Sequence, residues 1–182
     1  MDVSEHTAAQ DRSADPGTAL LALYDSALPH VYGYLLSRCG KAALAEDLTA
    51  ETFLAAVDAV RRDDSPPVST PWLVGVARHK LADHWRRRAR EERHLSSVAA
   101  DWDDEEPDDP WDAHLDAVRA RDTLACLSPP HQAALTLRYL DDLPVPEVAD
   151  LLERSIHATE ALLVRARSAF RRAYEAGEER DD

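Results

Sequence analysis

Apolar residues recur along this chain at intervals of three and four, the spacing that places them on one face of an α-helix. In the first half the pattern predicts helices over residues 19–39, 42–62 and 71–94. The break at 63–71 contains three prolines, the last of which begins the third of these helices. Thr70 followed by Pro71 is typical of the N-cap and first residue of a helix. The first half is therefore expected to form a small helical bundle.

A second group of helices is predicted in the last third of the chain. Ser128-Pro129-Pro130 and Leu143-Pro144 are each expected to begin a helix, because proline is well tolerated in a first turn. The short helix over 145–152, a three-residue turn that ends at Ser155, and a final helix over 156–172 have the order of a helix-turn-helix. Ser155 is a suitable N-cap for the final helix. Such signals are common, and many small helix pairs satisfy them.

The composition agrees with this helical pattern. Glycine and phenylalanine are scarce, at five and two residues, whereas Ala, Leu, Glu and Arg are frequent. We expect an all-α fold of two small helical domains joined by an acidic flexible linker. The expected divisions are a disordered tail at 1–17, a first domain at 18–95, the linker at 96–111, a second domain at 112–176 and a disordered tail at 177–182.

The sequence argues against several classes of protein and site. No apolar run approaches the roughly 18 residues that span a bilayer, and the polar start lacks the blocks of a secretory signal, so we expect no membrane insertion and a cytoplasmic protein. Cys39 and Cys126 lie far apart without a Cys-x-x-Cys pattern, which favours reduced thiols over a disulfide or a zinc site. Because no Gly-rich phosphate loop or nucleophile elbow occurs, we expect neither an enzyme nor a cofactor.

The net charge of −14 is distributed unevenly. Residues 78–93 contain seven Arg or Lys against three acids, and residues 154–172 contain five Arg against one acid. Residues 101–116 contain nine acids and no base. Two basic segments therefore flank an acidic one. The local cations suit phosphate, but the field of the whole molecule repels a duplex, so we expect weak DNA binding until a partner brings the protein to DNA.

The predicted helix over 42–62 has two partly apolar faces. A helical wheel places one set of residues toward the core: Ala50, Phe53, Leu54, Val57 and Val60. A second stripe lies nearly opposite: Leu44, Leu48, Glu51, Thr52 and Ala55. A helix with a second apolar stripe can dock a partner. A fully internal helix of a three-helix bundle would show the same pattern, and periodicity alone does not separate the two.

The predicted helix over 71–94 divides in the same way. Its inward residues are expected to be Val74, Ala77, Leu81 and Trp85, and its outward residues Trp72, Val76, His79, Asp83 and Arg86. Exposed aromatic and guanidinium groups suit unpaired DNA, because bases stack on them while cations hold the phosphates. A solvated, charged helix end is the alternative for this segment taken alone. In the final helix Ile156, Thr159, Leu163, Ala166 and Phe170 are expected to face inward.

Four motifs together resemble a known family. The run Ala45-Glu46-Asp47-Leu48-Thr49-Ala50-Glu51-Thr52-Phe53-Leu54 and the segment from Pro71 to Arg88 resemble the promoter-melting half of an extracytoplasmic-function sigma factor. Leu127-Ser128-Pro129 and Arg165-Ala166-Arg167 resemble parts of that family's second domain. The resemblance implies that core RNA polymerase and promoter DNA are partners, and it leaves open whether an anti-sigma factor also binds.

The resemblance also assigns roles to residues. Polymerase binding is expected of Leu44, Asp47, Leu48, Glu51, Thr52, Phe53 and Ala55, although Phe53 also suits the core. Recognition and melting of the minus-ten element are expected of Asp64, Ser65, Thr70, Trp72, Val76, Arg78, His79, Lys80, Asp83, Arg86, Arg87 and Arg88. Recognition of the minus-thirty-five element is expected of Arg154, Ser155, His157, Ala158, Ala161, Arg165, Ser168 and Arg172. His79 stands where the family commonly has Asn. Ala158, Glu160 and Leu162 stand where it often has Thr, a basic residue and Arg. The resemblance therefore does not predict which promoter sequence is recognised.

Two other functions fit part of the sequence. His79, Asp83 and His84, with the acids near residue 47, have spacings seen in helical metal-dependent hydrolases. We expect no metal site, because His84 lies about 140° from His79 on a helical wheel and arginines nearby would repel a cation. A helix-turn-helix regulator that is not a polymerase subunit would explain the second half equally well. It would not explain the two-faced helix followed by a stripe of Trp, His and Arg.

Overall fold

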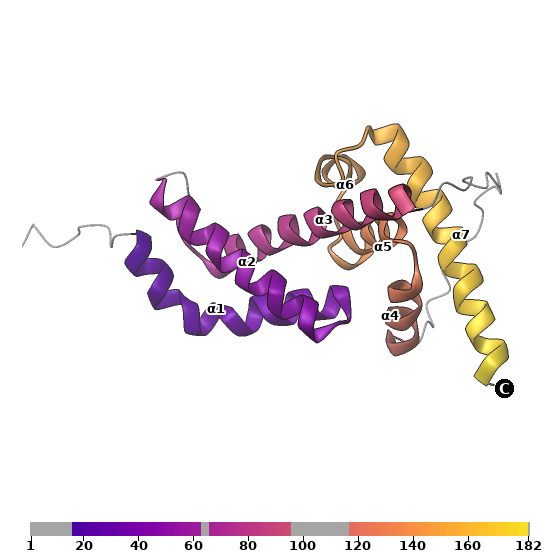
Figure 1. Cartoon of the computed structure of the whole chain (residues 1–182), viewed down its shortest axis with the longest axis horizontal. Coiled ribbons are helices and arrows are strands. Elements are labelled where there is room, and N and C mark those ends of the chain that lie inside the picture. Colours follow the sequence, from indigo (N-terminus) through magenta and orange to yellow (C-terminus); the bar gives the residue numbers. More distant parts are fainter. Residues whose placement is uncertain (1–15, 63–65, 96–116, 182) are drawn as a thin grey trace, which may run out of the picture.

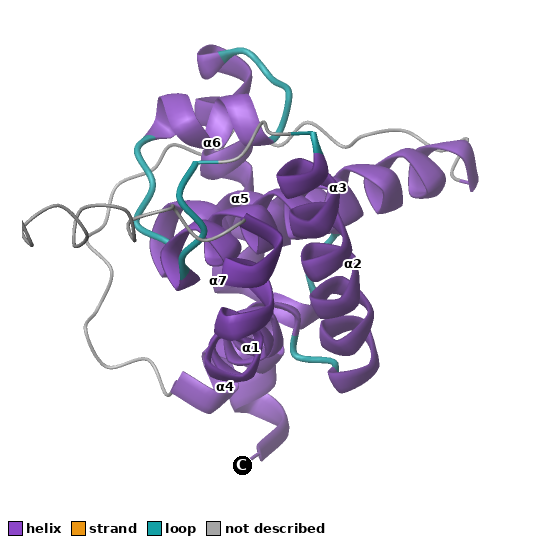
Figure 2. Ribbon diagram, turned by 90° about the vertical axis from the view of Figure 1, so that its left-hand side faces the viewer, coloured by secondary structure: helices purple, strands orange, loops and turns teal. Residues whose placement is uncertain are grey.

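A computed structural model describes residues 16–62, 66–95 and 117–181. The acidic linker expected at 96–111, most of the tail at 1–17, and Asp64 and Ser65 fall outside these ranges. Within them the chain forms helices and no strand (Figure 2). In chain order the elements are α1 (Pro16–Cys39), α2 (Ala42–Arg61), α3 (Thr70–Leu95), α4 (Ala117–Cys126), α5 (Pro129–Leu135), the π-helical turn η1 (Thr136–Leu140), α6 (Val145–Leu151) and α7 (Ile156–Asp181).

Helices α1, α2 and α3 pack pairwise into a three-helix bundle, here called the first module. Its core contains Val31, Leu35, Leu48, Leu73 and Leu81, none of them more than 1% exposed. The α1–α2 connection is short because Gly40 takes a left-handed φ of 66° and donates its N–H to the carbonyl of Leu36 at 2.9 Å. Glycine suits this position since it has no Cβ to clash in that conformation.

Three serines occupy N-cap positions close to where the sequence predicted. Ser128 is the N-cap residue of α5 without a capping bond from its side chain, whereas Ser155 precedes α7 and its Oγ accepts the N–H of Ala158 at 3.2 Å. The third cap differs from the prediction by one residue. Ser69 rather than Thr70 is the N-cap of α3, because its carbonyl accepts the N–H of Leu73 at 3.0 Å and its Oγ lies 3.4 Å from the N of Trp72. A serine and a threonine side by side are both good caps, so sequence alone could not choose between them.

Helices α4 to α7, with η1, form the second module. Its core contains Leu137, Val148, Leu163, Ala166 and Phe170. The helix-turn-helix order predicted for its end is present, as α6, a turn at residues 152–155 and α7. The prediction of a disordered tail from residue 177 is wrong as far as residue 181, because α7 continues past Gly177 to that point.

Helix α3 belongs to both modules. Its first half packs between α1 and α2, and it also packs against α5 of the second module (Figure 1). One cluster of buried apolar side chains runs through the two modules. The two domains expected from sequence are therefore present, and in this structure they lie against each other.

Candidate polymerase and nucleic-acid interfaces

The buried face of α2 differs from the prediction. Leu48 and Thr52, expected to face a partner, are 1% and 0% exposed, and Phe53 is also in the core. Leu54, expected in the core, is 65% exposed. Leu48 and Thr52 therefore belong to the core of the first module and not to its exposed surface, and Leu44, Glu51 and Ala55 are half-buried at the edges of the packed face.

Two buried threonines explain why the buried face of α2 differs from the prediction. Thr49 and Thr52 are buried because each hydroxyl donates a hydrogen bond to the carbonyl four residues earlier, at 2.6 and 2.7 Å. This local bond satisfies the hydroxyl without a partner from another helix. If both threonines are counted as apolar, the buried residues have regular helical spacing: Ala45, Leu48, Thr49, Thr52, Phe53 and Ala56.

The face of α2 that remains exposed is mixed. Asp47, Ala50 and Leu54 lie along it, and Asp58 continues the same line. Beside it, α1 and α2 enclose a largely apolar groove of about 470 Å³. The groove is lined by Tyr24, Leu28, Pro29, Tyr32, Glu46, Thr49, Ala50 and Phe53. Sequence reasoning missed this surface because it depends on how α1 lies against α2.

The DNA-facing side predicted for α3 is only partly exposed. Ala77, Leu81 and Trp85 are buried as predicted, and Val74 is half-buried. His79, Arg87 and Arg88 are exposed. The other expected contacts are half-buried: Thr70, Trp72, Val76, Arg78, Lys80, Asp83 and Arg86. Trp72 packs against the core cluster, so part of its ring is available to a stacked base and part supports the fold.

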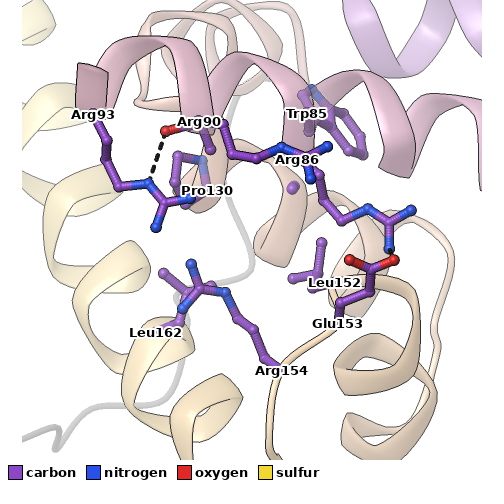
Figure 3. A pocket seen from close by; sticks show the side chains of 11 residues that line it. Trp85, Arg86, Arg90, Arg93, Pro130, Leu152, Glu153, Arg154 and Leu162 are labelled. Atoms are coloured by element: carbon purple, nitrogen blue, oxygen red, sulfur yellow. Dashed lines mark hydrogen bonds and ion pairs between the residues drawn. The ribbon is translucent and has the colours of Figure 1, made fainter. Parts of the chain in front are cut away.

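The basic end of α3 meets the second module around a pocket of about 280 Å³ (Figure 3). Four arginines and one glutamate line it: Arg86, Arg90, Arg93, Arg154 and Glu153. Arg86 Nη1 lies 2.5 Å from Glu153 Oε1. Burial, and then the charges of Arg93 and Arg165, lower the pKa of Arg154. The pocket thus gathers positive charge from both modules, which is an environment suited to phosphate.

A buried ionic cluster also joins the modules. Asp141, whose side chain is 1% exposed, follows η1 in the second module. Its carboxylate accepts hydrogen bonds from Tyr34 Oη at 2.7 Å and Arg38 Nε at 2.9 Å, and Arg78 Nε lies 3.3 Å from it. We call these four residues the Asp141 cluster.

Protonation follows this geometry. Burial, and then Asp141, raise the pKa of Tyr34, so its hydroxyl stays protonated as a donor. Burial alone would lower the pKa of Arg78, but Tyr34 and Asp141 raise it overall. Sequence reasoning did not find the cluster because its members are separated by up to 107 residues.

The helix-turn-helix presents most of its predicted residues outward. His157 and Arg172 are exposed, and Ala158, Ala161, Arg165 and Ser168 are half-buried on α7. One inward assignment is wrong, because Ile156 is 51% exposed in the first turn of α7. Leu162 is instead 4% exposed. Its position, where the family often has Arg, is therefore part of the core of this protein.

Among the described residues, no group of three or more His, Cys, Asp or Glu side chains could hold a metal ion. Burial, and then Arg87 and Arg88, lower the pKa of His84, which agrees with a positive local field. No helix within the described ranges is both long and apolar enough to cross a bilayer.

Comparison with known proteins gives the same division into two parts. Residues 23–91 match the family model Sigma-70 region 2, and residues 117–170 match Sigma-70, region 4. The ECF RNA polymerase sigma factor BldN of Streptomyces coelicolor is 34% identical over 152 residues, which cover 79% of this chain and 56% of BldN. The ECF RNA polymerase sigma factor SigL of Mycobacterium tuberculosis is 33% identical over 141 residues, 75% of this chain and 78% of SigL.

A solved structure shares the fold. The sigma factor RpoE of Bartonella quintana, in complex with the anti-sigma factor NepR, superposes with a TM-score of 0.52 at 21% identity, over 85% of this chain and 96% of RpoE. The two family models match the first module and then the second module along the chain. The chain belongs to the family of extracytoplasmic-function (ECF) RNA polymerase sigma factors.

Proposed function

We propose that this sigma factor binds core RNA polymerase through the first module, separates promoter DNA on α3, and reads an upstream duplex element with α6 and α7. The observation that carries the proposal is the presence, on one chain, of both matched sigma regions with a basic surface on each. The work is done by binding and strand separation, without covalent chemistry. We also propose that it acts in the cytoplasm, where a bacterial polymerase and its promoters are found.

The exposed face of α2 and the adjoining groove are the proposed polymerase-binding surface. Asp47 and Glu51 supply carboxylates, and Ala50 and Leu54 supply apolar area beside the groove between α1 and α2. Apolar contacts surrounded by charge are typical of a specific protein interface. In this assignment Leu48, Thr52 and Phe53 act indirectly, because they hold α2 on α1 and α3.

The exposed side of α3 is the proposed site for the melted strand. His79, Arg87 and Arg88 are accessible, and the half-buried Trp72 lies about two helical turns before His79. Unstacking a base costs a few kcal/mol, and stacking on aromatic and guanidinium groups offsets part of that cost. The loop before α3, which includes Asp64 and Ser65, is proposed to receive an extruded base, as the family resemblance implies.

The start of α7 is the proposed reader of duplex DNA. Ser155 caps this helix, and His157, Ala161 and Arg165 follow on its outward side. A helix N-terminus in the major groove places such residues against base edges, while nearby cations bind phosphates. Arg154 and Arg172 are proposed to make phosphate contacts.

The decisive experiment uses core polymerase, a promoter library and two matched variants. Leu54→Asp places a charge on the proposed polymerase surface, and Val118→Asp places one on α4 of the second module. The two positions are similarly exposed, Leu54 at 65% and Val118 at 66%. We expect wild type and Val118→Asp to co-purify with core polymerase and direct specific initiation, and Leu54→Asp to lose about tenfold or more in polymerase affinity. Specific initiation absent from the wild type, or equal polymerase binding by both variants, would contradict the proposal.

A further inference from the structure

We infer that the second module is the resident partner of the basic side of α3, held there by the Asp141 cluster, and that this contact restrains DNA binding until the modules separate. The inference rests on the proposed function in one respect, namely that α3 and α7 bind DNA. Two cations that the family resemblance assigns to the minus-ten element are already engaged in this structure. Arg78 is paired with Asp141, and Arg86 with Glu153.

The chain around Asp141 is built to present its carboxylate. The N–H of Asp141 donates to the carbonyl of Thr136 at 3.1 Å, which closes the wide π-helical turn, and the N–H of Leu143 donates to Leu137 O at 3.1 Å. Between them Asp142 takes a left-handed φ of 51°. π-Helical turns are rare and occur often at functional sites. The geometry is fixed within the second module, so Asp141 does not have to reorganise when it meets the first module.

The pairing is stronger than an exposed ion pair. Asp141 is almost fully buried, and the side chains of Arg38 and Arg78 are only 21% and 29% exposed. Hydrogen bonds to a charged group contribute about twice as much as neutral ones, and screening by salt is weak at a buried site. Arg38 also lies over the ring of Tyr34, 4.2 Å from its centroid, so the α1 side of the contact is preformed.

The same interface contains features that favour separation. Closure brings Arg90 and Arg93 of the first module beside Arg154 of the second, and like charges in one pocket repel. The pocket of about 280 Å³ also shows that the modules do not fill the space between them. This repulsion opposes the apolar contacts that run between the modules. The Asp141 cluster and the Arg86–Glu153 pair are attractive contacts that offset it.

Two adjacent positions offer a matched test. Asp141→Asn removes the buried charge with little change in shape. Asp142→Asn makes the same charge change one residue later, where the side chain is 98% exposed and pairs with Arg138 of its own module at 3.6 Å. Asn tolerates the left-handed backbone at residue 142. Arg38→Gln removes one of the cluster's two cations in the first module, and Arg38 itself is not assigned to DNA.

The measurements are small-angle X-ray scattering of the free full-length chain and fluorescence anisotropy with random-sequence single-stranded and duplex oligonucleotides, without polymerase. We expect Asp141→Asn and Arg38→Gln to enlarge the radius of gyration and to lower the ratio of closed to open molecules about 10- to 100-fold. DNA affinity should rise by up to the same factor, because closed molecules are unavailable for binding. Asp142→Asn should match the wild type, and the combined effect in Arg38→Gln/Asp141→Asn should be smaller than the product of the two single effects, because both changes remove the same Arg38–Asp141 contact.

Several results would overturn the inference. Scattering of Asp141→Asn identical to that of Asp142→Asn, with both folded by circular dichroism, would show that the cluster does not hold the modules together. Expansion without a gain in DNA affinity would show that closure does not restrain binding. The scattering measurement does not depend on transcription. If the wild type failed to direct initiation with core polymerase, the proposed function would be refuted, and the scattering would still establish or refute the contact between the modules.

Discussion

Replacing Leu48 by Ala tests whether this residue belongs to the core or to the polymerase surface. Leu48 is 1% exposed on α2, and Leu54, six residues later on the same helix, is 65% exposed. The same Leu→Ala change therefore removes the same atoms from two different environments. This makes Leu54→Ala the matched control.

The magnitude follows from burial. Removing the buried carbon atoms of Leu48 loses about 2 kcal/mol of transfer free energy, and the cavity left behind raises the total to about 3–4 kcal/mol. Leu54→Ala should change the free energy of unfolding by less than about 1 kcal/mol, since most of its side chain is already in water. For a domain that is stable by about 5–15 kcal/mol, the first change is a large fraction.

Urea denaturation followed by helical circular dichroism measures both variants. We expect the midpoint of Leu48→Ala to fall clearly below that of Leu54→Ala, with a similar denaturant slope. In native buffer the folded fraction of Leu48→Ala should still bind core polymerase. If Leu48→Ala kept the wild-type midpoint and yet lost polymerase binding, Leu48 would be a contact residue and the assignment of the α2 face above would be refuted.

Two further predictions concern the second module. Ser155→Ala should lower the free energy of unfolding by about 1 kcal/mol, because the N–H of Ala158 loses its hydrogen-bond acceptor. Ser168→Ala in the helix interior should be neutral or slightly stabilising. Equal effects of the two changes in thermal melts would contradict this. Burial, and then Arg165 and other nearby charge, lower the pKa of His131, so the unfolded chain binds a proton that the folded chain does not, and stability should fall as pH drops below about 6.5. His131→Gln should reduce the difference in melting temperature between pH 7.5 and 5.5, and an undiminished difference would contradict this.

Sequence predicted the helices well because their signals are local. Apolar periodicity, paired prolines and serine caps each act within one or two turns, and the predicted bounds of the first two helices lie within a few residues of α1 and α2. The prediction of an α3 cap was off by one residue because Ser69 and Thr70 are both competent. The family resemblance rested on similarly local motifs, and the comparisons confirm it.

The faces of the helices were less predictable. Thr52 satisfies its hydroxyl within its own helix, so a residue that looks polar in sequence is fully buried. Ile156 is apolar and nonetheless 51% exposed, because it lies in the first turn of α7, at the end of the packed face. Which residues meet across the two modules could not be predicted at all. Tyr34 and Asp141 are 107 residues apart, and no periodic pattern relates one to the other.

The sharing of α3 between two packing interfaces has a consequence for how this protein can change over evolutionary time. Trp85 is in the core and also lines the pocket opposite Pro130 and Leu152 of the second module. A substitution there alters the fit on both sides at once, so compensating changes must arise in segments distant in sequence. The two halves are therefore expected to be inherited as a pair, and exchanging one half with that of a relative should succeed only when the donor's residues opposite Trp85 are transferred with it.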